Sequence, residues 1–362
     1  MCQTLPVAVP VPGSFGDITA TWVSAALREG GATDAVVTSV EVEPLGEGVG
    51  FLGDLARLRL SHDPQVTAAH RPDRLIAKLP TTDPGGRAVG ETLNVWPREA
   101  AFFADVAPQV PQCVPTCWYN GAEVYSGRFT LLLDDVGPIP VDQVAGATPA
   151  QAEAALDVLA RFHARWWQRQ AFAWMPGMDD PGAEHLQVAM TAALPAFAQR
   201  YGSTVPPETV RWLAAFVEGL GPWRTRQGAK PLTIVHADYR LDNVLFAPDG
   251  AVKIVDWQTA LRGPAALDVA SFVCNSLTVE DRRAHEARLL AHYRHALAQA
   301  GVDIAESTLE TDYREAILFW MGIYAMNLSR IDPTDARGTA LFQAMIDRTY
   351  TAAADHRVGE LL

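Results

Sequence analysis

The spacing of apolar and polar residues divides the chain into a strand-rich first part and a helix-rich second part. In the first part apolar residues mostly alternate with polar ones, which is the period of a half-buried strand. Strands are predicted over residues 35–44, 55–60, 74–79, 113–119 and 128–133. A helix is expected after Asp17, as its N-cap, and another over 91–106 with its start near Pro97. The pattern therefore predicts an antiparallel sheet with one or two helices.

Beyond Pro138 the apolar residues recur at helical spacing. Helices are predicted over residues 150–170, 186–201, 207–220, 279–300 and 309–329. One interruption, over 233–255, is strand-like: the segment TIVH, a turn with the sequence APDG and the strand 252–255 indicate a hairpin. A small sheet followed by a larger helical part predicts the α+β class.

The length of 362 residues corresponds to about two domains of ordinary size. An acidic pair followed by Val-Gly-Pro marks a plausible hinge where the pattern changes from strands to helices. We expect an N-terminal β-rich lobe over residues 1–133, a hinge over 134–138 and a C-terminal helical lobe over 139–362.

Composition and charge exclude several classes of protein. The formal net charge of −13 argues against nucleic-acid binding and against docking on anionic lipid, because both need basic surface. The four cysteines have neither disulfide-framework nor zinc-site spacing. The first 16 residues lack the features of a secretory signal, and the apolar run 316–329 is too short to cross a bilayer. We therefore expect a cytoplasmic protein that binds neither nucleic acid nor membrane.

The segment 233–268 carries the residues with the clearest chemistry. His236, Asp238 and Asn243 stand in one loop, and Asp256 follows the predicted hairpin. Two carboxylates and an amide at this spacing suit phosphoryl transfer, in which metal ions neutralise the charge on the phosphoryl group. Asn243 and Asp256 offer the oxygen ligands that Mg²⁺ prefers, which leaves Asp238 to accept the proton of an attacking hydroxyl.

The order of these residues resembles a known family. His-x-Asp-x-x-x-x-Asn, followed by Asp-Trp-Gln at 256–258, is similar to the catalytic loop and metal-binding Asp of the protein-kinase-like superfamily. HADYRLDN and VDWQ look most like the branch of small-molecule kinases that contains aminoglycoside phosphotransferases and choline/ecdysteroid kinase-like proteins. Ala237 stands where that branch has Gly, and Trp257 stands where protein kinases have Phe. The resemblance implies a two-lobe, protein-kinase-like fold.

The resemblance also implies a nucleotide site in the first lobe. Lys78, in the strand-like RLIAKL, matches the family's lysine on the α- and β-phosphates, and Glu99 matches the glutamate that pairs with it. The glycine-rich segment 46–53 takes the place of the phosphate-contacting loop, with Gly48 and Gly50 as the candidates for close approach to phosphate.

The sequence LLLDDV at 131–136 resembles the family's hinge, so the backbone of Asp134, Asp135 and Val136 is expected to bind the purine base. Acceptor specificity is expected in the helical lobe, around residues 175–220 and 309–330. The acceptor remains open between an amino sugar and a more apolar alcohol, including a natural product or antibiotic.

These inferences favour an enzyme that moves the γ-phosphate of ATP, or of GTP, to a hydroxyl of a small molecule with the help of Mg²⁺. The alternative is a non-catalytic, nucleotide-binding regulatory protein on the same fold. A protein kinase is disfavoured, because the Asp-Phe-Gly and Ala-Pro-Glu segments are missing. The oligomeric state is left open.

Three polar residues near the motif have expected structural roles. His163 is interpreted as a buried structural histidine among aromatic residues, and Asp268 as the N-cap of the following helix, with a second role in bracing the loop left open. Arg240, inside the loop, could steady either a phosphate or a buried carboxylate, and the sequence does not decide between these.

Overall fold

The computed structural model describes residues 9–31, 36–45, 52–65, 71–123, 127–170, 172–180, 184–327 and 336–362. The chain forms two compact units. The first, here called the sheet unit, comprises residues 1–138 with 256–258, and the second, the helical unit, comprises residues 139–255 and 259–362. A sheet-rich part is followed by a helix-rich part, so the expected α+β class is confirmed. Among the described residues, no helix combines the length and the apolar character needed to cross a membrane.

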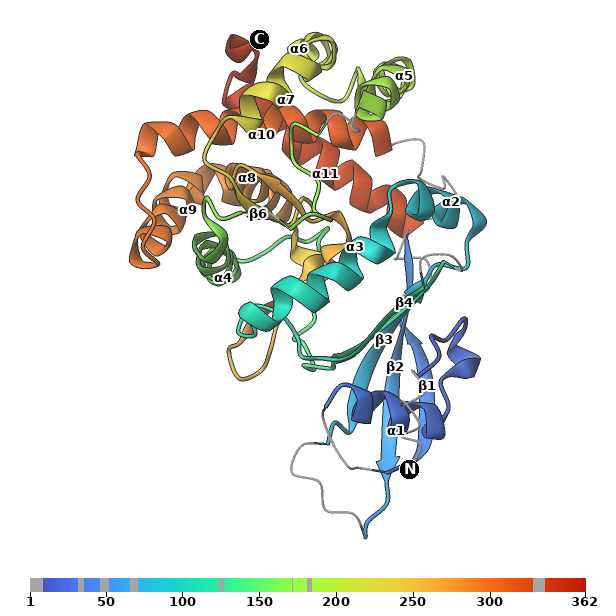
Figure 1. The fold of residues 1–362 in the computed structure, drawn as a ribbon. Helices are drawn as coiled ribbons and strands as arrows, with labels where there is room; N and C mark the ends of the chain where they lie inside the picture. Colours follow the sequence, from blue (N-terminus) through green and yellow to red (C-terminus); the bar gives the residue numbers. More distant parts are fainter. Residues whose placement is uncertain are drawn as a thin grey trace. The chain divides into compact units, whose positions relative to one another are not determined.

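The sheet unit is built on five antiparallel strands in the order β1-β2-β3-β5-β4 (Figure 1). They are β1 (Val37–Leu45), β2 (Gly53–His62), β3 (Arg74–Pro80), β4 (Cys117–Glu123) and β5 (Arg128–Asp134). The strand predicted from residue 113 thus begins later, at Cys117, after a turn. Lys78 of central strand β3 pairs with Leu55 on one side and with Leu131 on the other, so neighbouring strands set its position from both sides.

Helix α1 (Ala20–Glu29) packs on one face of this sheet. Its residues Trp22 and Leu27 share a buried apolar cluster with Ala77 and Leu79 of β3. Because successive residues of a strand point to opposite faces, Lys78 points away from α1. The alternation of side chains along β3 therefore places the charged side chain of Lys78 on the sheet face opposite this core.

The helix expected over residues 91–106 is in fact a shorter helix followed by a π-helical turn, and a separate helix, mostly before residue 91, precedes them. These are α2 (Pro84–Thr92), α3 (Val95–Ala101) and the turn Phe102–Val106. Asn94, with a φ of 53°, separates the two helices and redirects the chain. Pro97 does not start α3 but lies in its first turn, where a missing N–H removes no intrahelical hydrogen bond.

The expected N-cap of α1 is also corrected. Thr19 caps the helix, and its hydroxyl oxygen accepts the N–H of Trp22 at 3.2 Å. Asp17 instead ends a short 3₁₀ turn, where its carboxylate accepts the backbone N–H of Ser14 at 2.9 Å. Because Asp and Thr are both good caps, their order in the sequence did not decide between them.

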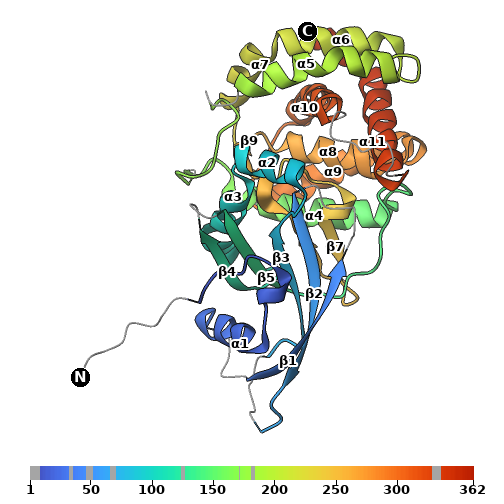
Figure 2. The same cartoon turned by 90° about the vertical axis from the view of Figure 1, so that its right-hand side faces the viewer.

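The helical unit contains eight long helices within its described residues. They are α4 (Pro149–Trp166), α5 (Glu184–Tyr201), α6 (Pro207–Glu218), α7 (Leu220–Gly228), α8 (Ala266–Ser276), α9 (Val279–Gln299), α10 (Glu306–Asn327) and α11 (Ala336–Asp355). In Figure 2, α5, α6 and α7 lie on one side of α10, and α4, α8 and α9 lie on the other. The pattern predicted over 207–220 ends at Gly219, where the separate helix α7 follows, and α11 was not predicted.

Four short strands carry the segment with the candidate chemistry. They are β6 (Thr233–Val235), β7 (Val244–Phe246), β8 (Val252–Ile254) and β9 (Leu261–Gly263). The hairpin is formed by β7 and β8, whereas the TIVH segment pairs through β6 with β9. The prediction therefore placed the turn correctly and named the wrong first strand. As a result, the loop from His236 to Asn243 lies between β6 and β7 and starts from a buried strand.

Candidate active site

In the sheet unit, Lys78, Glu99 and Asp256 form a cluster here called the lysine cluster. The Nζ of Lys78 lies 2.9 Å and 2.7 Å from the two carboxylate oxygens of Glu99 and 2.6 Å from Oδ1 of Asp256. Strand β3 supplies the lysine and helix α3 supplies the glutamate, because the side chain opposite the α1 core faces that helix. The structure thus brings together three of the residues singled out in the sequence.

Burial and charge make the lysine cluster a strongly coupled group. The side chains of Lys78 and Glu99 are 9% and 1% exposed, whereas that of Asp256 is 27% exposed. Burial alone would lower the pKa of the Lys78 ammonium, but Asp256 and Glu99 together hold that pKa above its usual value. The lysine is therefore charged at neutral pH, and Asp256 is the partner that a ligand can reach.

Gly53, at the start of β2, leaves the space that the Lys78 side chain occupies. A Cβ atom at position 53 would lie 3.0 Å from Cε of Lys78. Immediately before it, the carbonyl of Leu52 accepts the indole N–H of Trp96 on α3 at 2.8 Å. The sequence interpretation missed both contacts. Gly48 and Gly50, the two predicted phosphate-loop glycines, lie outside the described residues.

The three predicted hinge residues differ in how their polar groups are used. Asp134 accepts the indole N–H of Trp118 at 2.6 Å, and Asp135 binds Arg57 at 2.7 Å. Both carboxylates are thus part of the sheet unit's own structure. Within the described ranges, the backbone N–H and C=O of Val136 make no hydrogen bond. A backbone donor and acceptor are therefore available at the end of the sheet unit.

In the helical unit, Asp238 and Asn243 are in direct contact. The amide nitrogen of Asn243 donates to the backbone oxygen of Asp238 at 2.8 Å and to its Oδ2 at 3.1 Å. The contact is possible because a 3₁₀ turn, Leu241–Asn243, folds the loop back on itself. The amide oxygen of Asn243 faces away from the nitrogen that makes these bonds, so it is the atom suited to a cation.

Asp268 braces the start of this loop from helix α8. Its two oxygens accept the backbone N–H groups of His236 and Ala237 at 2.7 Å and 2.9 Å. It is not the helix N-cap that the sequence suggested, because α8 already begins at Ala266. The expected structural role of His163 agrees with its contacts: it is fully buried, and its Nε2 lies 3.2 Å from Asp268.

Ala237 and Asp256 both adopt left-handed backbone conformations, with φ of 60° and 68°. Residues other than Gly rarely occupy this region, because the Cβ atom crowds the following carbonyl. Local strain of this kind concentrates at functional sites, where the surrounding structure holds it in place. Ala237 directly precedes the predicted base, Asp238, and Asp256 is itself one of the predicted metal ligands.

The donor set suits Mg²⁺ rather than a transition metal. In the described part of the chain no group of three or more His, Cys, Asp or Glu side chains could hold a metal ion. Mg²⁺ needs no such cage, because it takes one or two protein oxygens and completes its shell with phosphate oxygens and water. Asn243 and Asp256 offer oxygens of this kind.

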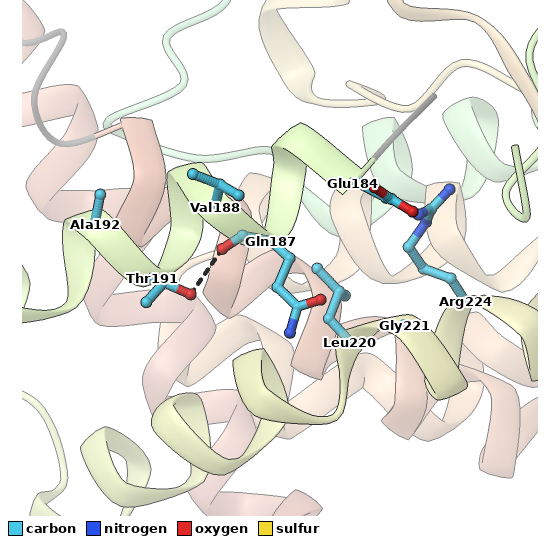
Figure 3. A pocket seen from close by; sticks show the side chains of 8 residues that line it. All are labelled: Glu184, Gln187, Val188, Thr191, Ala192, Leu220, Gly221 and Arg224. Atoms are coloured by element: carbon cyan, nitrogen blue, oxygen red, sulfur yellow. Dashed lines mark hydrogen bonds between the residues drawn. The ribbon is translucent and has the colours of Figure 1, made fainter. Parts of the chain in front are cut away.

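A pocket of about 670 Å³ lies on the helical unit where α5 and α7 meet (Figure 3). Its lining combines apolar and polar side chains: Glu184, Gln187, Val188, Thr191, Ala192, Leu220, Gly221 and Arg224. Arg224 is 8% exposed, and its guanidinium donates to the carbonyls of Met178 and Asp180. This region overlaps the stretch 175–220 in which acceptor specificity was expected.

Solved structures share this fold at low sequence identity. A putative aminoglycoside phosphotransferase from Ralstonia eutropha is 15% identical, with a TM-score of 0.55, and the match covers 92% of this chain and 97% of that chain. A spectinomycin phosphotransferase in complex with ADP and spectinomycin is 12% identical, with a TM-score of 0.53, covering 94% and 99%. At these identities the likeness concerns the fold.

A curated relative matches over a shorter stretch. An uncharacterized kinase-like protein of Caenorhabditis elegans is 38% identical over 65 residues. The match spans 17% of this chain and 17% of the length of that relative. The evidence for membership of a family comes from a longer match: the model described as the phosphotransferase enzyme family covers residues 55–335. This range includes the lysine cluster, the loop with Asp238 and Asn243, and the brace at Asp268. The chain therefore belongs to the phosphotransferase enzyme family.

Proposed function

We propose that the protein transfers the γ-phosphate of ATP, or of GTP, to a hydroxyl group of a small molecule, with Mg²⁺ as cofactor. The observation that carries the proposal is the lysine cluster, because a buried ammonium joined to Glu99 and to the accessible Asp256 suits a phosphate-binding lysine. Bound Mg²⁺ would neutralise charge on the transferring phosphoryl group, and Asn243 and Asp256 are its proposed ligands.

Within the sheet unit, Lys78 is proposed to bind the α- and β-phosphates, with Glu99 holding it in place. The free backbone groups of Val136, beside Asp134 and Asp135, support the proposal that this segment binds the purine base. Gly48 and Gly50 remain the proposed phosphate-loop glycines. In functional terms, residues 1–133 would bind the nucleotide and residues 134–138 would act as a hinge.

Within the helical unit, residues 139–362, Asp238 is the proposed base and hydroxyl-orienting group. Its carboxylate is 31% exposed, so a hydroxyl can approach it. Because phosphoryl transfer has a loose transition state, most of the catalysis would come from positioning and from charge neutralisation. The pocket of α5 and α7 supports an acceptor with both apolar and polar parts, such as an amino sugar or a hydroxylated natural product. A cytoplasmic location belongs to the same proposal, since nucleoside triphosphates are supplied there.

The nucleotide part of the proposal can be tested by lysine labelling. The chain has only three lysines, Lys78, Lys230 and Lys253, so a lysine-acylating ATP analogue has few targets. We expect acylation of Lys78 that excess Mg-ATP prevents, read by mass spectrometry of the peptides. Competition with Mg-GTP measures which base is preferred. Equal labelling of the three lysines, unaffected by nucleotide, would contradict the proposed nucleotide site.

The transfer reaction can be tested with labelled nucleotide and a panel of acceptors that covers amino sugars, aminocyclitols, quaternary amino alcohols and apolar alcohols. We expect transfer to at least one class, and a decrease in kcat of about 10²–10⁴-fold in Asp238→Asn. Asp249→Asn is the matched control, because Asp249 lies in the exposed β7–β8 turn and binds only backbone there. Wild-type kcat in Asp238→Asn would refute the assignment of the base.

A further inference from the structure

Arg240 joins two carboxylates of the loop that contains Asp238. Its Nε lies 3.4 Å from Oδ1 of Asp238, and another nitrogen of the same guanidinium binds Oδ2 of Asp242. The Arg240 side chain is 16% exposed, so its guanidinium is partly shielded from water. The tighter contact is the one with Asp242, which makes Asp242 the anchor of the guanidinium.

The backbone next to Arg240 is held by the end of helix α8 and by the segment before α4. The N–H of Leu241 donates to the Ser276 hydroxyl at 3.0 Å, and the N–H of Asp242 donates to the Gln143 side chain at 3.3 Å. The N–H of Asn243 in turn donates to the carbonyl of Arg240 at 2.9 Å. With its backbone held in this way, Arg240 can reach only a small set of positions.

The two oxygens of Asp238 are contacted by different side chains. Arg240 lies next to Oδ1, and Asn243 donates to Oδ2. Contacts to both oxygens restrict rotation of the carboxylate about its Cβ–Cγ bond, because turning the group would break both. Tyr324 of α10 is part of the same environment: burial raises the pKa of its phenol, the Asp238 charge raises it further and Arg240 lowers it.

We propose that Arg240 is a positioning residue that acts through Asp238, orienting the carboxylate toward the acceptor hydroxyl while Asp242 holds the guanidinium in place. The inference rests on the proposed function, in which Asp238 is the base. Of the two alternatives that the sequence left open for Arg240, the inference favours a carboxylate over a phosphate, although the carboxylates concerned are partly exposed rather than buried.

A double-mutant cycle tests this role. We would measure kcat, the KM for the nucleotide and the KM for the acceptor. Each is measured for Arg240→Gln in the wild-type background and in the Asp238→Asn background. A positioning error of the order of 1 Å can cost about 10²-fold in rate, so Arg240→Gln should lower kcat by roughly 10- to 100-fold in the wild type. In the Asp238→Asn background the same substitution should change kcat less than about 2-fold, because coupled residues are not additive. Both KM values should stay within about 2-fold.

Two further variants keep the test informative if Arg240→Gln does not fold. Arg240→Lys keeps the charge and should recover part of the lost kcat, and Asp242→Asn removes the anchor without touching Asp238. The matched control is Arg282→Gln, because Arg282 is a buried, ion-paired arginine of the same unit that binds Glu286 and Asp355. That variant should lose stability while keeping kcat per nucleotide-binding site.

The outcomes separate the two proposals. If Asp238→Asn keeps wild-type kcat, the proposed base is wrong and the inference falls with it. A second outcome is that Asp238→Asn loses kcat, while Arg240→Gln or Arg240→Lys lowers kcat by the same factor in both backgrounds. Arg240 would then be a structural residue, and only the inference would be overturned. An increase in nucleotide KM with unchanged kcat would assign Arg240 to phosphate binding and would also overturn it.

Discussion

Lys78 and Asp256 are in contact at 2.6 Å although 178 residues separate them in the sequence. The contact places Asp256 beside the central strand of the sheet unit. Glu99, on the other side of the ammonium, is enclosed, whereas Asp256 remains partly exposed. One carboxylate is therefore suited to hold the lysine permanently and the other to exchange partners when a ligand binds.

Removing the ammonium should have a larger effect at Lys78 than at Lys230. Lys78→Met would leave the buried carboxylate of Glu99 without its counter-charge, so we expect a loss of about 3–5 kcal/mol of unfolding free energy and loss of nucleotide binding. Lys230→Met is the matched control, since Lys230 also binds two carboxylates, Asp312 and Glu315. Urea unfolding and nucleotide titration measure both effects. Equal nucleotide affinity in the two variants would contradict the proposed role of Lys78.

Adding one methyl group at Gly53 should weaken nucleotide binding. Gly53→Ala places a Cβ atom 3.0 Å from Cε of Lys78, and that side chain is held by its two carboxylates and cannot easily move aside. We expect the nucleotide KM to rise roughly 3- to 10-fold, equivalent to about 0.7–1.4 kcal/mol. Gly16→Ala is the control, because Gly16 is exposed and a Cβ there would meet only the Ser14 hydroxyl oxygen, at an ordinary contact distance of 3.6 Å. An unchanged KM would mean that the strand adjusts to the extra atom.

Glycine should be tolerated at position 237 better than the natural alanine. Ala237→Gly relieves the left-handed strain at φ 60°, while the added freedom of the unfolded chain offsets part of the gain. We expect a stability gain of up to about 1 kcal/mol, measured by thermal and urea unfolding, with kcat within about 2-fold of wild type. A clear loss of stability would show that the Ala237 methyl group makes contacts worth more than the strain.

The Arg57–Asp135 pair should make stability depend on acid pH. Burial alone would raise the pKa of the Asp135 carboxyl. The hydrogen bond and charge of Arg57, the N–H of Gly137 and the charge of Arg74 together outweigh burial and hold that pKa below its usual value. A lowered pKa stabilises the fold above the unfolded value of about 4, and the stabilisation is lost as pH falls toward the lowered pKa. Urea unfolding from pH 3 to 7 should therefore show a shallower pH dependence in Asp135→Asn. Parallel curves for the wild type and Asp135→Asn would show that Asp135 does not contribute to the pH dependence of stability.

Local patterns predicted much of the fold because they depend on neighbouring residues. Alternation identified β3 with Lys78, helical spacing identified most of the helical unit, and the APDG turn marked the β7–β8 hairpin. The errors occurred where several residues compete for the same role. Thr19 displaced Asp17 as an N-cap, and Asn94 divided one long helical pattern into α2 and α3.

The candidate site was predictable as a set of residues but not as a set of contacts. The motif placed Asp238 and Asn243 in one loop, and their contact follows from a short turn. The sequence left the bracing role of Asp268 open, because the contact joins a side chain to N–H groups 31 and 32 residues away and leaves no periodic signal. The space at Gly53 depends on strand register, which no single segment specifies.

Because of the order Ala77-Lys78-Leu79, the proposed nucleotide site can form only when β3 pairs in the correct register. A slip of one residue in the pairing of β3 would exchange its two faces, burying the ammonium under α1 and presenting two apolar side chains to α3. Such a molecule could fold into a compact state but could not hold phosphate. The fraction of a preparation that reacts at Lys78 would then measure the fraction of molecules whose central strand is in register.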